Sequence, residues 1–132
     1  MAKKRKTLES ETKFVHLAGD LSQGAAIDKT SARERVLVPA RRIDAGEIVF
    51  RVRAGMPEVN IAAGDFLIVE RRETGHAATG ELVVVMAGGR AFIGHWWAKH
   101  GERALLDDEL AAVTGDGAME ILGAVTLILR WH

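Results

Sequence analysis

The sequence contains no cysteine. This absence excludes disulfide bonds, thiolate metal sites and a cysteine nucleophile, and it suits a reducing compartment. The first 13 residues, MAKKRKTLESETK, are polar and have no apolar stretch behind their charges, so they do not have the pattern of a signal peptide. No stretch of the chain has the apolar length that a membrane-spanning helix needs. We therefore expect a cytoplasmic protein that does not enter a membrane.

The chain also has no excess of positive or negative charge. The chain has 18 Lys and Arg residues and 18 Asp and Glu residues, so its net charge gives no argument for a nucleic-acid partner. One run of cations stands near the N-terminus: Lys3, Lys4, Arg5 and Lys6. This run could touch DNA phosphates, although a solvated tail is the more common role of such runs. Residues 1–13 are expected to be disordered, and residues 14–35 to form a loop or extended arm with little core of its own.

From residue 36 onward the sequence has the patterns of short β-strands. Residues 47–53 read EIVFRVR, in which Ile48, Phe50 and Val52 share one face, and this alternation is typical of a half-buried strand. The expected strands are Val36–Val38, Glu47–Arg53, Phe66–Glu70, Glu81–Met86, Ala91–Trp97, Arg103–Leu106 and Ile121–Trp131. Their close spacing predicts an all-β domain over residues 36–132, with a small, strongly bent sheet or partial barrel.

Three segments together carry a resemblance to a known family. Residues 50–56 read FRVRAGM and are followed at a fixed distance by Gly64-Asp65. Residues 80–83 read GELV and lead into a hairpin with a double-glycine turn, and residues 119–125 read MEILGAV. In this order and spacing they resemble the C-terminal domain of the LexA/UmuD family of self-cleaving serine peptidases. The resemblance implies the bent all-β fold of LexA and signal peptidases, with Met56, Gly64 and Asp65 at the turn beside the cleft.

The same resemblance places the family's serine nucleophile at Gly55 and its general-base lysine at Gly94. Neither residue has a side chain. The last serine of the chain is Ser31, and the only lysine after Lys29 is Lys99, which stands an odd number of residues past Gly94 and should face the other side of its strand. A serine–lysine dyad needs a hydroxyl beside a desolvated amine. We therefore expect the chain to be catalytically inactive.

Family members cleave themselves at a small-residue–glycine bond in the N-terminal arm, and Ala18-Gly19 has this composition. The dipeptide is either a relic of a cleavage site or an ordinary loop dipeptide. In the first case residues 14–27 could still lie along the sheet and fill the cleft as a bound strand.

The last strand is the best candidate for a dimer interface. Residues 121–129 are apolar on both faces, as expected of a strand buried by its own sheet and by a partner. The resemblance implies a two-fold dimer through this strand, and two-fold contacts are the most common kind. Two adjacent tryptophans should face opposite ways, one into the core and one toward the surface. The expected interface residues are Ile121, Leu122, Val125, Leu127, Leu129, Trp96 and Trp97.

Metal and cofactor sites are not expected. His95 and His100 have opposite parity along their strand and would not converge on an ion, and no third ligand is evident. The consecutive acids Asp107, Asp108 and Glu109 fit a solvated loop better than a cation site.

These observations leave two hypotheses. The first is a catalytically inactive LexA/UmuD-like homodimer that acts by binding proteins; by resemblance only, the partner would be a RecA filament, a polymerase or a repressor. The alternative is a divergent serine peptidase that cleaves itself near Ala18-Gly19 with a displaced nucleophile or base. The only hydroxyls after Ser31 belong to threonines, and none stands at the nucleophile turn: Thr74, Thr79, Thr114 and Thr126.

Overall fold

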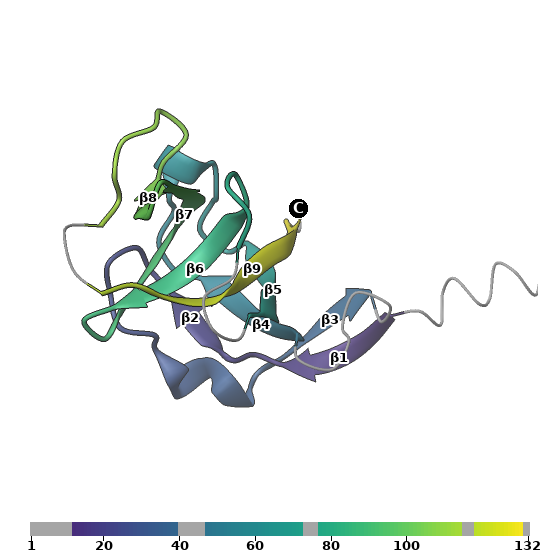
Figure 1. Cartoon of the computed structure of the whole chain (residues 1–132). Helices are drawn as coiled ribbons and strands as arrows, with labels where there is room; N and C mark the ends of the chain where they lie inside the picture. Colours follow the sequence, from purple (N-terminus) through teal and green to yellow (C-terminus); the bar gives the residue numbers. More distant parts are fainter. Residues whose placement is uncertain (1–11, 40–46, 73–76, 115–117, 131–132) are drawn as a thin grey trace, which may run out of the picture.

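The computed structural model describes residues 12–39, 47–72, 77–114 and 118–130. These residues form β-strands and two 3₁₀-helices and include no α-helix (Figure 1). The elements in chain order are β1 (Thr12–His16), β2 (Gly19–Leu21), η1 (Lys29–Arg33), β3 (Arg35–Pro39), β4 (Glu47–Val52), η3 (Pro57–Val59), β5 (Phe66–Arg71), β6 (Leu82–Ala87), β7 (Arg90–Lys99), β8 (Glu102–Leu106) and β9 (Glu120–Leu129).

Seven strands form one strongly curled sheet in the order β2-β4-β5-β9-β6-β7-β8. β2 runs parallel to β4, and the other neighbours in this sheet are antiparallel. β1 and β3 form a separate antiparallel ribbon, which extends to the right of the large sheet in Figure 1. The predicted all-β fold with a strongly bent sheet is confirmed. Each strand expected after residue 35 is present, and its ends differ from the expected ones by no more than two described residues.

The curl of the sheet has a local cause in its central strand. β9 has one unpaired residue in each of its two strand pairings. This residue is Thr126 in the pairing with β5 and Leu122 in the pairing with β6. Such bulges increase the twist of a strand. Between them, Gly123 lies so near the backbone of Glu70 that even a Cβ atom would overlap it. A glycine is therefore required at this contact between β5 and β9.

The buried side chains form three clusters, which the curl separates. The inner cluster fills the concave side of the sheet and consists of Leu21, Phe50, Val52, Met56, Val59, Ile61, Leu67, Val69, Val84, Ala91 and Ile93. The outer cluster joins the β1–β3 ribbon to β4 and β5 through Leu17, Val38, Val49 and Ile68. The third, the Trp96 cluster, consists of Val83, Val85, Trp96, Leu105, Ile121 and Ala124.

The N-terminal segment differs from the expectation. Residues 12 and 13, expected to be disordered, belong to β1, while residues 1–11 lie outside the described part of the chain. The segment 14–35 was expected to have little core of its own, but Leu17 is buried in the outer cluster and Leu21 in the inner cluster. A division at residue 35 would also separate β1 from its partner strand β3. Residues 12–35 thus form strands and a 3₁₀-helix that contribute side chains to clusters shared with the large sheet.

Candidate functional site

The turn that follows β4 is held rigidly around Met56. This side chain is fully buried, and its backbone forms two hydrogen bonds with Ile61, at 2.7 and 3.1 Å. The short helix η3 fills the turn between them, and Asn60 ends it in the left-handed conformation. Gly55, directly before Met56, is exposed. The turn expected from the sequence is present. Gly55, the residue at which the resemblance places the nucleophile, faces solvent and has no side chain.

A shallow depression lies beside this turn, next to an ion pair. Asp65 is buried, accepts a hydrogen bond from the Ala62 amide at 2.9 Å and binds the Arg130 guanidinium through both oxygens, at 2.9 and 2.8 Å. The carboxylate raises the pKa of Arg130 above its ordinary value. Asp65 therefore ties the turn to the residue that follows β9. The depression has a volume of about 330 Å³ and is lined by Gly55, Pro57, Asn60, Ile61, Ala62 and Arg130.

Gly94, where the resemblance places the general-base lysine, lies in a different environment from Gly55. It pairs with Val83 of β6 and is buried. A Cβ atom at Gly94 would lie 2.8 Å from the carbonyl oxygen of Leu106 and 2.9 Å from the Cγ atom of Leu105. The nearest atoms to a Cβ at Gly55 belong instead to residues 61–63, at 3.4 Å or more. The two glycines thus share none of these neighbours, and β8 closes the space into which a side chain at position 94 would extend.

This difference gives a matched pair of substitutions. Gly94→Ala should lower the free energy of unfolding by about 1–3 kcal/mol, because the added methyl group overlaps β8. Gly55→Ala should change it by less than about 0.5 kcal/mol, because the site is exposed and has room. Urea denaturation followed by circular dichroism measures both. Equal effects of the two substitutions would contradict the crowding at position 94.

The hydroxyl groups of Ser31, Thr79, Thr114 and Thr126 contact carboxylate, carbonyl or sulfur acceptors and not a basic side chain. Ser31 donates to the Asp20 carboxylate at 3.0 Å, and Thr79 to the carbonyl oxygen of Ala98 at 3.1 Å. Thr114 and Thr126 also contact acceptors, the sulfur of Met119 in the first case and a carboxylate and a carbonyl in the second. Thr74 lies outside the described residues. All three described lysines are exposed: Lys13, Lys29 and Lys99.

One acid–imidazole pair does lie near the turn. His95 Nε2 is 2.7 Å from Asp108 Oδ1, and the Asp108 amide donates to the carbonyl of Glu58 at 2.8 Å. The other ring nitrogen of His95 lies 3.4 Å from the carbonyl of Gly80 rather than near a hydroxyl. The pair therefore connects β7 and the loop after β8 to η3, and it lacks the hydroxyl that a catalytic triad requires.

The Ala18–Gly19 bond lies within the sheet. The Ala18 amide donates to the carbonyl of Val49 at 2.7 Å, and Gly19 pairs with Phe50 of β4. Gly19 is buried and has a φ of 150°, and a Cβ atom there would approach the Asp28 carbonyl to 2.8 Å. Only glycine fits this position. The dipeptide thus leads into β2 at Gly19, and it lies beside the middle of β4 rather than at the Gly55 turn.

Beyond β2, the arm crosses to β7. The Gln23 side chain donates to the carbonyl of Ile93 at 2.8 Å and accepts from the amide of the same residue at 2.7 Å. Gly24 donates to the carbonyl of Ala91, and the Ala91 amide donates to the carbonyl of Ala25, both at 2.8 Å. β8 pairs only with residues 95–99 of β7. The arm therefore occupies the part of the β7 edge that β8 leaves open, and it joins the two sides of the curled sheet.

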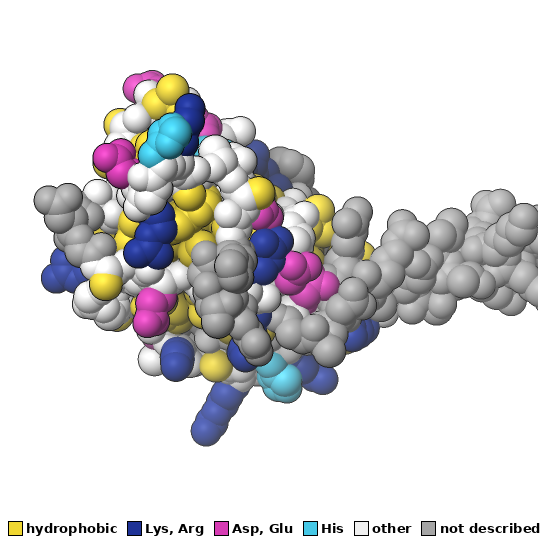
Figure 2. Space-filling model, in the orientation of Figure 1, with side chains coloured by type: hydrophobic (Ala, Val, Ile, Leu, Met, Phe, Trp, Pro, Cys, Tyr) yellow, Lys and Arg dark blue, Asp and Glu magenta, His cyan; other side chains and the backbone are white. Residues whose placement is uncertain are grey.

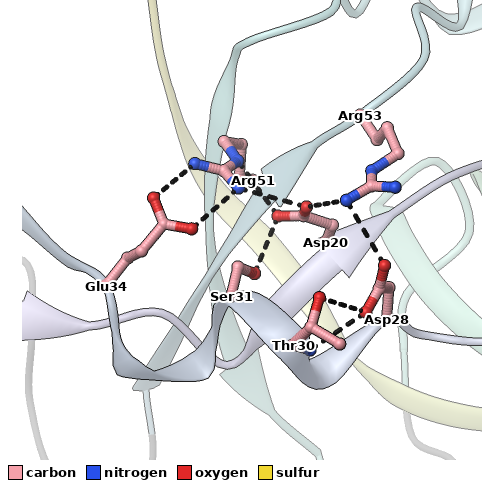
Figure 3. A network of polar contacts seen from close by, with 7 residues as sticks. All are labelled: Asp20, Asp28, Thr30, Ser31, Glu34, Arg51 and Arg53. Atoms are coloured by element: carbon pink, nitrogen blue, oxygen red, sulfur yellow. Dashed lines mark hydrogen bonds and ion pairs between the residues drawn. The ribbon is translucent and has the colours of Figure 1, made fainter.

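A buried carboxylate fixes the start of this arm (Figure 3). Asp20 accepts hydrogen bonds from Arg51 at 3.0 and 3.2 Å, from Arg53 at 3.0 Å and from the Ser31 hydroxyl at 3.0 Å. Glu34 binds the same Arg51 guanidinium from the other side, at 2.9 and 3.1 Å. Burial raises the pKa of Asp20, but the hydrogen bonds from Arg51, Ser31 and Arg53 outweigh it, so the pKa lies below its ordinary value. Asp20 is therefore held as a carboxylate.

This network predicts a pH-dependent loss of stability. Because the native pKa of Asp20 is below its ordinary value of 3.8, its contribution is complete well above that pH and is lost as the pH falls through the native pKa. At pH 7, Asp20→Asn should lower the free energy of unfolding by about 2–3 kcal/mol, since hydrogen bonds to a charged group are lost.

Denaturant unfolding at pH 7 and at pH 3 measures the change, with the exposed Glu109→Gln as the control. The difference between wild type and Asp20→Asn should shrink at pH 3, and the control should show neither effect. A difference that stays constant with pH would show that Asp20 is not held as a carboxylate.

The residues expected at a dimer interface differ in their burial and in the clusters that they contact. Trp96 is buried in the cluster named after it and Trp97 is half-buried, as expected of neighbours on opposite faces. β9 lies between β5 and β6, so strand neighbours occupy both of its edges. Within the chain, Ile121 is buried, Leu122 and Val125 pack on the inner cluster, and Leu127 and Leu129 pack on the outer cluster. Much of the apolar character of β9 is thus explained by the chain's own core.

The sequence interpretation missed the residues that hold the arm. Arg51 in β4 and Arg53 directly after it alternate with Phe50 and Val52, and this charged pair was the one local signal of a buried acid. Asp20 and Gln23 gave no such signal, because their partners are 31 to 70 residues away. The His95–Asp108 pair was missed for a similar reason.

No protein-family model matches this chain. Among the described residues no group of three His, Cys, Asp or Glu side chains is arranged to hold a metal ion. The described part of the chain also contains no helix that is long and apolar enough to span a membrane.

Proposed function

We propose that this chain is a non-catalytic, homodimeric protein-binding module with a LexA/UmuD-like scaffold. The observation that carries the proposal is the state of the two dyad positions. Gly55 presents no hydroxyl at the exposed turn, and β8 crowds the space beside Gly94 so that a lysine there would require β8 to move. The contacts of the described serine and threonine hydroxyls supply no replacement dyad.

The arm gives a second argument against self-cleavage. A peptidase must hold its scissile bond in an exposed, extended form next to the nucleophile. Here Ala18-Gly19 is hydrogen-bonded along β4, and Gly19 is buried. The arm therefore serves as a permanent part of the sheet in this proposal, and the turn at Gly55 is left free for a partner.

The surface that would receive a protein partner is the depression beside that turn. Its wall combines apolar side chains with Arg130, whose guanidinium is anchored by Asp65 and is still partly exposed. Arginine is one of the residues that are enriched in protein interfaces. The classes of partner remain those that the resemblance implies: a RecA filament, a polymerase or a repressor.

Self-cleavage separates this proposal from the peptidase alternative. After prolonged incubation at pH 10, where a substantial minority of ordinary lysine side chains is neutral, the intact mass of the purified chain should be unchanged. The variant Gly55→Ser should also stay intact, because a hydroxyl alone lacks the neighbouring amine. Mass spectrometry measures both. A fragment that ends at Ala18 in either sample would refute the non-catalytic proposal and favour a divergent peptidase.

Dimerisation is tested by sedimentation velocity. We expect twice the chain mass of 14.3 kDa. Leu127 and Leu129 pack on the outer cluster but are only half-buried, and their remaining exposed apolar surface is where a partner would contact β9, so Leu129→Asp should convert the dimer to a monomer. Leu110→Asp, at a residue that is 76% exposed on a different loop, is the matched control and should remain dimeric. A wild-type monomer at all concentrations would remove the dimer from the proposal.

A further inference from the structure

Charge is distributed unevenly along this neutral chain. Residues 1–39 contain eight Lys or Arg residues and five Asp or Glu residues, whereas residues 40–132 contain ten and thirteen. The N-terminal segment thus carries a net charge of +3 and the rest of the chain −3. Such an asymmetry is an indication of an anionic partner for the basic part.

In the structure, the surface charge of the N-terminal segment is more positive than its net charge suggests, because its described acids are paired. Each described acid of the N-terminal segment, Asp20, Asp28 and Glu34, is paired with Arg51 of β4 or with Arg53 directly after that strand. The cations of the same segment make no ion pair with another described residue: Lys13, Lys29, Arg33 and Arg35. Figure 2 shows Lys, Arg and His side chains along the lower rim of the molecule, where η1 and the β1–β3 ribbon lie in Figure 1.

The ribbon also presents an aromatic ring among these cations. Phe14 and Leu37 are directly opposite one another across the two strands and are 63% and 39% exposed. The guanidinium of Arg35 lies 5.6 Å from the centre of the Phe14 ring. The opposite face of the ribbon packs on the outer cluster through Val15 and Val38. One face therefore anchors the ribbon, and the other exposes an apolar pair bordered by positive charge.

We propose that this exposed face, made of Phe14, His16, Arg35 and Leu37, binds single-stranded nucleic acid. Arg35 supplies a cation for a phosphate on this face, the other unpaired cations lie nearby in the same N-terminal segment, and the exposed Phe14 ring offers an apolar surface on which an unpaired base can stack. A base in a duplex is stacked on both sides by its neighbours, so the exposed ring favours a single strand. This activity is independent of the protein-binding function proposed above, which uses the Gly55 turn on other strands.

Fluorescence anisotropy with a labelled 20-nucleotide oligo(dT) and the full chain tests the proposal. Binding should weaken as salt is added, and Phe14→Ala should weaken it about fivefold or more, the effect of losing one stacked base. Arg35→Gln should reduce the slope of log affinity against log salt by about 0.7. Arg90→Gln, at an exposed arginine of β7, is the matched control and should leave both quantities unchanged. Circular dichroism checks that each variant is folded.

Several results would overturn the proposal. One is the absence of binding at low salt. Another is binding that depends on Lys3, Lys4, Arg5 and Lys6 but is unaffected by Phe14→Ala, which would assign it to the charged tail alone. Tighter binding to the duplex than to the single strand would also contradict it. Finally, conversion of a dimer to a monomer by Phe14→Ala, without any binding of the oligonucleotide, would show that a second copy of the chain covers the ribbon.

Discussion

The buried carboxylate of Asp20 is the interaction on which the arrangement of the N-terminal half depends. Arg51 of β4, Arg53 directly after that strand and Ser31 of a 3₁₀-helix converge on it, so a single side chain joins β2, η1 and β4. A buried carboxylate is tolerated only when its hydrogen bonds are satisfied. Its requirement for partners therefore fixes the start of the arm and, through the next three residues, the position of Gln23 on β7.

That constraint changes the role of the arm. In the LexA/UmuD resemblance this segment would be a substrate that is released after cleavage. In this chain it supplies Leu17 and Leu21 to two cores and completes the β7 edge. Its removal would expose both clusters, so the proposed loss of catalysis and the structural use of the arm are consistent with one another.

The strands after residue 35 could be predicted because their signals are local. The alternation in β4 and the apolar runs of β5 and β9 are visible within six to ten neighbouring residues. β2 could not be found in this way, because it has three residues and its parallel partner is about 30 positions away. At the candidate site, the sequence indicated that the expected hydroxyl and amine are missing. It could not indicate that β8 crowds Gly94, which depends on the backbone of Leu106.

The central claim is that the arm is an integral part of the sheet. Amide hydrogen–deuterium exchange of the full chain at neutral pH tests this claim most directly. The amides of Ala18, Asp20 and Gly24 donate to the carbonyls of Val49, Asp28 and Ala91. If the arm is a fixed strand, their protection should approach that of the amides in the central strands β5 and β9. Rapid exchange at all three positions, with β5 and β9 still protected, would contradict the claim.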